Sequence, residues 1–268
     1  MMHAALLRPR SPAGDPVCLG CMSSIATSIE ALPPDVTRVL QPLLERAVDA
    51  LSSDLRSIVL YGSGAERQLR PTSDVNLIFV LRVFDRAAAD ALGEPLRVAR
   101  AAANVRIMFL PENDIAAAAS AFAIKFADIG RRRKVLYGDD PFATLTVRAD
   151  ALRRHVEQVL LNFELRTREA YVVNGVREEQ LARVVARSAG PLRATAAGLL
   201  ELRGERAGSP KAALEQIAAE LPNGPWAPLL ALISKARTER ILPAGDAASA
   251  IDRLIDLARQ LRRVASHD

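Results

Sequence analysis

The segment Leu60–Leu81 restricts the fold of this chain more than any other stretch. A short apolar run ends at the turn Gly62-Ser63, and a polar spacer then leads to Asp74 and Asn76 at the start of a second apolar run. Short apolar runs bounded by glycine and polar residues are typical of buried strands. Residues i and i+2 of a strand point to the same face, so Asp74 and Asn76 are expected to share one face next to the turn.

This pattern suits the binding of phosphate groups and of a metal ion. Glycine lets the backbone approach a phosphate closely, and Ser63 adds a hydroxyl to the free N–H groups of the turn. Magnesium takes oxygen ligands, and two such ions neutralise the triphosphate in many phosphoryl-transfer reactions. Here Asp74 supplies a carboxylate, whereas Asn76 offers only a neutral amide oxygen. Asp74 is therefore the predicted metal ligand, and Asn76 is a weakened one.

The Gly-Ser turn and the Asp-x-Asn strand together resemble the signature of the nucleotidyltransferase superfamily that includes DNA polymerase beta. The resemblance covers residues 35–140, and aminoglycoside and minimal nucleotidyltransferases are similar in having a helical domain afterwards. It implies transfer of a nucleoside monophosphate from a nucleoside triphosphate to a hydroxyl acceptor, with magnesium as the cofactor. The residues that it implies are Asp74 and Asn76 for catalysis, Asp74 for the metal, and Gly62, Ser63, Arg67 and Ser73 for the nucleotide.

The chain departs from that signature at two of its acidic positions. The second metal-binding acid falls on Asn76, and the strand predicted at 105–110, where a third acid is common, carries Arg106. A guanidinium can hold phosphate oxygens through two parallel hydrogen bonds, so Arg106 is predicted to bind the nucleotide and partly to replace a metal. Glu112 and Asp114 follow this strand and are alternative acids. Magnesium dependence is thus predicted to be weak or absent, and a non-catalytic nucleotide-binding, regulatory or antitoxin-like protein is the alternative function.

Simpler structural roles compete with several of these assignments. Asp74 and Ser73 can close a turn through their own side chains, and Asn76 can be a polar strand residue that faces solvent. Arg67 can be a solvated loop residue. No histidine lies near Ser63 in the sequence, so this serine is not predicted to be a nucleophile.

Three segments are predicted along the chain. Residues 1–21, which are rich in proline, glycine and arginine, form a disordered extension; residues 22–145 form an α/β domain, and residues 146–268 form a helical bundle. The fold class is α+β, with a small mixed sheet and flanking helices followed by an all-α domain. Helical spacing and Gly/Pro breaks predict helices at 22–56, 85–100, 115–126, 151–173, 177–203, 210–220, 226–237 and 245–264.

Two further features of the sequence leave alternatives open. The basic run 131–134 precedes an apolar stretch and can be a helix C-terminus, which favours positive charge, or a patch for phosphate or RNA. In the helical half, either Glu157 or Glu164 can serve as a general base for an acceptor hydroxyl, as a glutamate does in some aminoglycoside-modifying relatives.

Composition excludes some classes of protein. Of 268 residues, 50% are hydrophobic and 25% are charged, which is typical of a globular chain, and no apolar run is long enough to span a bilayer. Cys18 and Cys21 lack the additional ligands of a zinc site, so a cytoplasmic protein with reduced thiols is expected. The net charge of +5 suits an anionic partner, but 4% aromatic residues disfavour single-stranded nucleic acid. A homodimer is compatible with the sequence.

Overall fold

The structure is a computed structural model that describes residues 29–70, 73–175, 177–239, 242–243 and 245–267. The chain divides into two compact units. The first comprises residues 29–114 and 132–143, and the second comprises residues 115–131 and 144–267. The predicted extension at 1–21, with both cysteines, lies outside the described residues.

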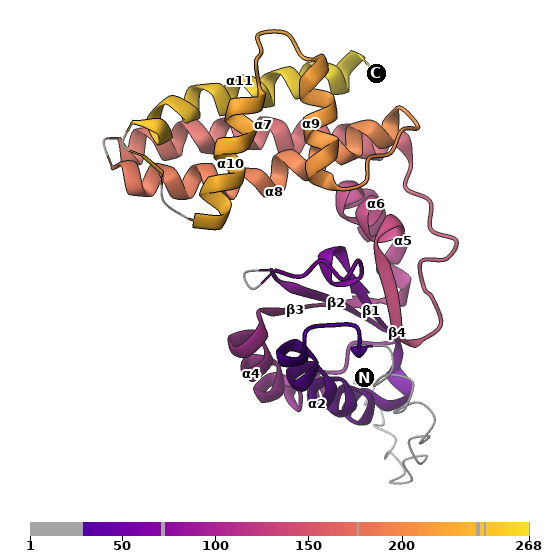
Figure 1. The fold of residues 1–268 in the computed structure, drawn as a ribbon. Coiled ribbons are helices and arrows are strands. Elements are labelled where there is room, and N and C mark those ends of the chain that lie inside the picture. The colour runs from indigo at the N-terminus through magenta and orange to yellow at the C-terminus, as the bar shows by residue number, and fades with distance from the viewer. Residues whose placement is uncertain (1–28, 71–72, 176, 240–241, 244, 268) are drawn as a thin grey trace, which may run out of the picture. The chain divides into compact units, whose positions relative to one another are not determined.

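The first unit is built on a four-stranded mixed sheet with the strand order β3-β2-β1-β4 (Figure 1). β1 runs antiparallel to both β2 and β4, whereas β2 and β3 are parallel. A parallel pair needs a crossover connection, and α3 and α4 lie between these two strands in the chain. The strands are β1 (Leu55–Tyr61), β2 (Val75–Leu81), β3 (Val105–Pro111) and β4 (Arg133–Gly138).

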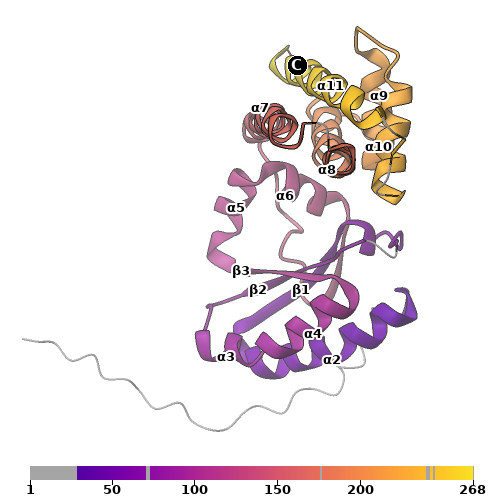
Figure 2. The same cartoon turned by 90° about the vertical axis from the view of Figure 1, so that its left-hand side faces the viewer.

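Helix α2 (Pro34–Leu51) and helix α4 (Gly93–Ala103) pack together and cover one face of this sheet (Figure 2). Proline at the first helical position suits the start of α2, because its missing N–H has no partner there. The apolar stripe of α2 is buried in the core of the first unit, together with alternate residues of the strands. The shorter elements of this unit are η1 (Ser52–Asp54), η2 (Gly62–Gly64), α3 (Arg86–Asp90) and η3 (Glu112–Asp114).

The second unit is all helical. Its long helices α7, α8 and α11 pack on one another, α8 also packs on α9 and α10, and α6 packs on α7 and α8 (Figure 1). An apolar stripe of α7, which includes Leu152, Val156 and Leu160, is buried in the core of the unit. The helices are α5 (Ile115–Ala121), α6 (Ala123–Arg131), α7 (Ala149–Asn174), α8 (Glu178–Leu202), α9 (Pro210–Glu220), α10 (Ala227–Glu239) and α11 (Asp246–His267).

The predicted fold class is confirmed, and several local expectations differ from the structure. The helix predicted at 22–56 ends at Leu51, and residues 55 and 56 already belong to β1. The basic run 131–134 ends α6 at Arg131, as a helix C-terminus would, but its last two residues begin β4, a strand that was not predicted. Helices α5 and α6, which were assigned to the first domain, belong to the helical unit, because Ala123, Ile124 and Ala127 are part of its core. No helix in the described part of the chain is long and apolar enough to cross a membrane.

The basic run is also not a free patch for phosphate or RNA. Arg131 pairs with Glu201. Arg132 pairs with Glu66 at 3.0 Å, and Arg133 holds Asp140 at 2.8 Å. Burial raises the pKa of Asp140, but the hydrogen bonds from Arg133 and from the N–H of Phe142 outweigh this effect and leave that pKa below its usual value. The three arginines therefore serve internal contacts.

Candidate functional site

Most residues predicted to bind the nucleotide meet at one end of the sheet. The register places Tyr61, the last residue of β1, opposite Asn76, and Asn76 beside Arg106 of β3. Paired residues on neighbouring strands point to the same face of a sheet. Leu60 and Leu77 occupy the alternate positions and are buried in the core of the unit. Asn76 and Arg106 therefore project from the face opposite to α2 and α4.

The Gly62 turn follows β1 directly and leaves open space above the backbone. Gly62 has a φ of +71°, a conformation that favours glycine, and its N–H donates to the carbonyl oxygen of Arg132 at 2.9 Å. A Cβ atom added to Gly62 would have no neighbour within 4 Å among the residues that the structure describes. The Ser63 carbonyl accepts the N–H of Gln68 at 2.9 Å, which closes the turn. Gly62 itself is buried and its N–H is already bonded, so the part of the turn that a phosphate group can reach is Ser63, which is partly exposed.

Asp74 forms an ion pair with Arg106. Arg106 Nε lies 3.6 Å from Asp74 Oδ1, and the two side chains are 47% and 52% exposed. Asp74 immediately precedes β2, whose register with β3 begins at Val75 and Val105, so Arg106 lies near the start of the paired segment. The side-chain amide of Asn76 donates to the main-chain carbonyl of Asp74 at 3.4 Å. The predicted metal ligand therefore faces a cation.

These residues do not fit a two-magnesium site. Within the described ranges, no three histidine, cysteine, aspartate or glutamate side chains are close enough together to hold a metal ion. The Asp74 carboxylate is engaged by Arg106, and the amide of Asn76 brings no negative charge. Glu112, one of the alternative acids, pairs instead with Arg56 at 3.4 Å.

Ser73 and Arg67, which were predicted to bind the nucleotide, have other contacts in the structure. The hydroxyl oxygen of Ser73 accepts the N–H of Arg70 at 3.1 Å, and the Ser73 N–H donates to the Arg70 carbonyl at 2.8 Å. Arg67 has a φ of +58° and lines a pocket of about 190 Å³ together with Leu60 and Lys134. Because Leu60 points into the core, on the opposite side from Asn76, this pocket does not bring Arg67 to the Asp74–Arg106 pair.

Comparison of the sequence with protein-family models and with curated proteins gives no match. Solved structures do match, among them the crystal structure of spectinomycin adenyltransferase AAD(9) from Enterococcus faecialis with ATP and spectinomycin. That likeness has a TM-score of 0.57 at 13% sequence identity, and it covers 81% of this chain and 97% of that chain. The chain has the nucleotidyltransferase fold. The likeness predicted from the Gly-Ser and Asp-x-Asn signature is thereby confirmed at the level of the fold.

The two glutamates considered as a general base have different surroundings. Glu164 on α7 is 2% exposed, and its carboxylate lies 3.0 Å from Arg262 and 3.3 Å from Arg168, with Arg259 at 4.0 Å. A buried carboxylate held by arginines of both helices joins α7 to α11. Glu157 is more accessible and accepts a hydrogen bond from the Ser266 hydroxyl at 3.0 Å.

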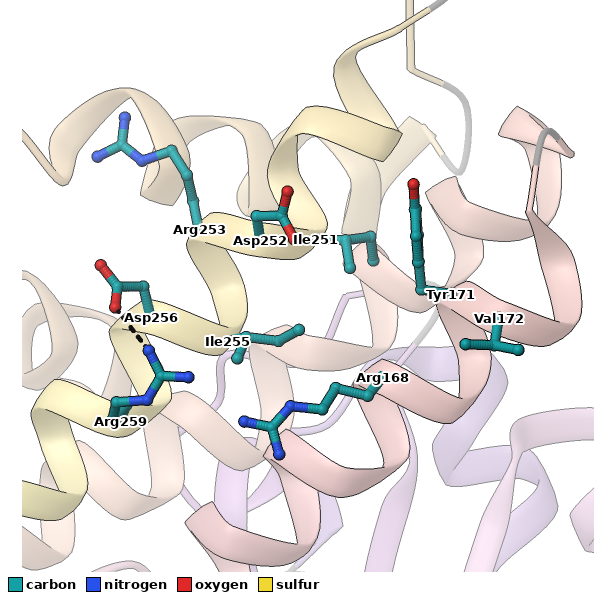
Figure 3. A pocket seen from close by; sticks show the side chains of 9 residues that line it. All are labelled: Arg168, Tyr171, Val172, Ile251, Asp252, Arg253, Ile255, Asp256 and Arg259. Carbon is teal, nitrogen blue, oxygen red and sulfur yellow. Dashed lines mark hydrogen bonds and ion pairs between the residues drawn. The ribbon is translucent and has the colours of Figure 1, made fainter.

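A groove between α7 and α11 was not predicted from the sequence. It has a volume of about 690 Å³, and Figure 3 shows the side chains that line it. Arg168 and Arg259 stand beside an apolar wall that includes Val172 and Ile255, and Arg259 pairs with Asp256 at 3.2 Å. No motif pointed to this groove, because its walls come from helices that are distant in the sequence.

Proposed function

We propose that the first unit binds a nucleoside triphosphate, with the phosphates over the Gly62–Ser63 turn and against Arg106. The observation that carries this proposal is the arrangement at the strand ends. The Gly62–Ser63 turn follows β1, and the half-exposed Arg106 lies on β3, with β2 between these strands in a nucleotidyltransferase fold. Such groups bind phosphate oxygens through N–H and O–H donors and a guanidinium.

The residues favour binding over chemistry. Nucleotidyl transfer relies on positioning and on cations that neutralise the triphosphate, and metal ions usually supply that charge. In this chain a single carboxylate, Asp74, is engaged by an arginine, and Asn76 stands where a second carboxylate is expected. We therefore propose a nucleotide-binding protein whose transfer activity is absent or strongly reduced, acting as a regulatory partner.

Transfer of a nucleoside monophosphate to a hydroxyl acceptor is the second candidate. It is favoured by the likeness to an adenyltransferase whose crystal structure holds ATP and spectinomycin. In that case Asp74 would be the metal ligand, Asn76 a weakened ligand, and the acceptor a hydroxyl-bearing molecule. Glu157 is the more accessible of the two carboxylates proposed to activate that hydroxyl.

Two measurements on the purified chain separate these functions. Calorimetric titration with ATP and with GTP tests binding, and release of pyrophosphate from labelled nucleotides, with magnesium in excess, tests transfer. Binding without pyrophosphate release agrees with the first candidate. Pyrophosphate release that Asp74→Ala abolishes and Asn76→Asp increases would establish the second. If neither nucleotide binds, both candidates are wrong.

A further inference from the structure

The net charge of the candidate site differs from that of a metal-binding site built from several carboxylates. A triphosphate is strongly anionic, and a set of carboxylates repels it unless divalent cations lie between them. In this chain the charges of Asp74 and Arg106 cancel, and Asn76 is neutral. The strand ends therefore bring no excess negative charge that a metal ion would have to offset.

Arg106 is placed to supply positive charge to the nucleotide itself. It is fixed on β3 beside Asn76, on the side of the sheet that bears Asp74, and its side chain is 47% exposed. The Asp74 carboxylate is also half exposed, and an exposed pair of this kind contributes only about 0–1 kcal/mol. A guanidinium in such a weak pair can exchange the carboxylate for phosphate oxygens, which accept two parallel hydrogen bonds.

We infer that Arg106 performs the charge neutralisation that magnesium provides in metal-dependent sites, so that the nucleoside triphosphate binds without a divalent cation. This inference rests on the proposed function. Asp74 then has the opposite role from a metal ligand: its carboxylate competes with the phosphates for Arg106. Removing the negative charge of Asp74 strengthens nucleotide binding, whereas at a metal-dependent site the same change weakens it.

A second ion pair of the first unit provides a matched control. Arg56 lies 3.4 Å from Glu112, and these side chains are 50% and 54% exposed, close to the values for Arg106 and Asp74. Arg56 is near the start of β1, whereas the Gly62 turn follows its end. Arg56→Ala removes the same charge from the same unit, and it leaves the proposed site intact.

The experiment is calorimetric titration of the full chain with ATP, in excess magnesium and in excess EDTA. Wild-type protein is expected to bind with the same affinity, within about threefold, in both buffers. In EDTA, Arg106→Ala is expected to weaken binding by about 10- to 100-fold, since a hydrogen bond to a charged group contributes about 1.5–3 kcal/mol. Asp74→Asn is expected to strengthen binding by about two- to fivefold. Arg56→Ala is expected to bind like wild type.

Each contrary result has a distinct meaning. Binding in magnesium that disappears in EDTA overturns the inference and leaves the proposed function intact. The same applies if Arg106→Ala and Arg56→Ala weaken binding equally, or if Asp74→Asn abolishes it. Absence of binding in both buffers refutes the proposed function, and the inference with it. Circular dichroism of each variant establishes that a loss of binding is not a loss of folding.

Discussion

Alanine at Gly138 is expected to destabilise the first unit more than alanine at Gly62, although the two glycines have nearly the same φ. Gly138 has a φ of +72° and Gly62 a φ of +71°. The left-handed conformation costs a residue with a Cβ atom about 1–2 kcal/mol, so this part of the loss should be equal in both variants. Any further difference must come from what the new methyl group meets.

The surroundings of the two glycines differ sharply. A Cβ on Gly138 would lie 2.0 Å from the carbonyl oxygen of Arg56 and 3.2 Å from the Cα of Ser57. Both are backbone atoms of β1, which pairs with β4 at this point, so no side-chain rotation relieves the overlap. Displacing a packed strand costs about 1–3 kcal/mol. We expect a total loss of about 2–5 kcal/mol for Gly138→Ala and about 1–2 kcal/mol for Gly62→Ala.

Urea unfolding of the full chain measures these losses. Far-UV circular dichroism follows the whole chain, and hydrogen exchange of peptides from β1 and β4 follows the first unit. Trp226, the only tryptophan, belongs to the helical core, so its fluorescence reports on the second unit. Equal losses for Gly138→Ala and Gly62→Ala would refute the argument from the Arg56 carbonyl. A loss seen only in Trp226 fluorescence would contradict the assignment to the first unit.

Three further outcomes are expected in the helical unit. Glu164→Ala should cost about 1–3 kcal/mol in urea unfolding, because the partly exposed arginines on α7 and α11 lose the buried carboxylate that they share. Glu169→Ala, which breaks an exposed pair with Arg166, should cost less than about 1 kcal/mol. Burial lowers the pKa of His155, whose Nδ1 accepts the N–H of Ile124 at 3.2 Å. The free energy of unfolding should therefore decrease as the pH falls below about 6.5, the pKa of histidine in the unfolded chain. The variant His155→Gln should flatten the pH dependence of the urea midpoint in that pH range. Gly190→Ala lies inside α8, where no described atom outside the neighbouring helix backbone is within 4 Å of the new Cβ. It should raise the free energy of unfolding by about 0.5–1 kcal/mol, and a destabilised variant would contradict this.

The sequence predicts those parts of the fold that local patterns determine. The predicted boundaries of α7 to α11 were close to the observed ones, because Gly/Pro breaks and apolar spacing are local signals. The single helix predicted at 115–126 is two helices, α5 and α6, the second of which continues to Arg131. Strand β4 was missed because its first residues are Arg133 and Lys134, which suit a helix end equally well. This segment forms a strand because it pairs with β1 and because Arg133 forms an ion pair with Asp140. Neither contact can be inferred from the few residues around position 133.

The candidate site likewise combines features set by local sequence with contacts between distant segments. The spacing of Asp74 and Asn76 predicted a shared face; in the structure β2 begins at Val75, so Asp74 lies just before the strand. That Arg106 pairs with Asp74 depends on the parallel alignment of β2 and β3, which no short motif encodes. The burial of Glu164 likewise depends on Arg262, which comes from the far end of the chain.

The division of the chain has a consequence for synthesis on the ribosome. Because each unit contains two separate stretches of sequence, the chain passes between the units three times. Helix α6 emerges before α7 and α8, so the apolar side chains of Ala123 and Ile124 have no core to join until much of the helical half has been made. The sheet of the first unit, in contrast, is complete once β4 has emerged. A nascent chain paused between these points would carry a finished sheet beside an exposed apolar helix, a surface that chaperones recognise.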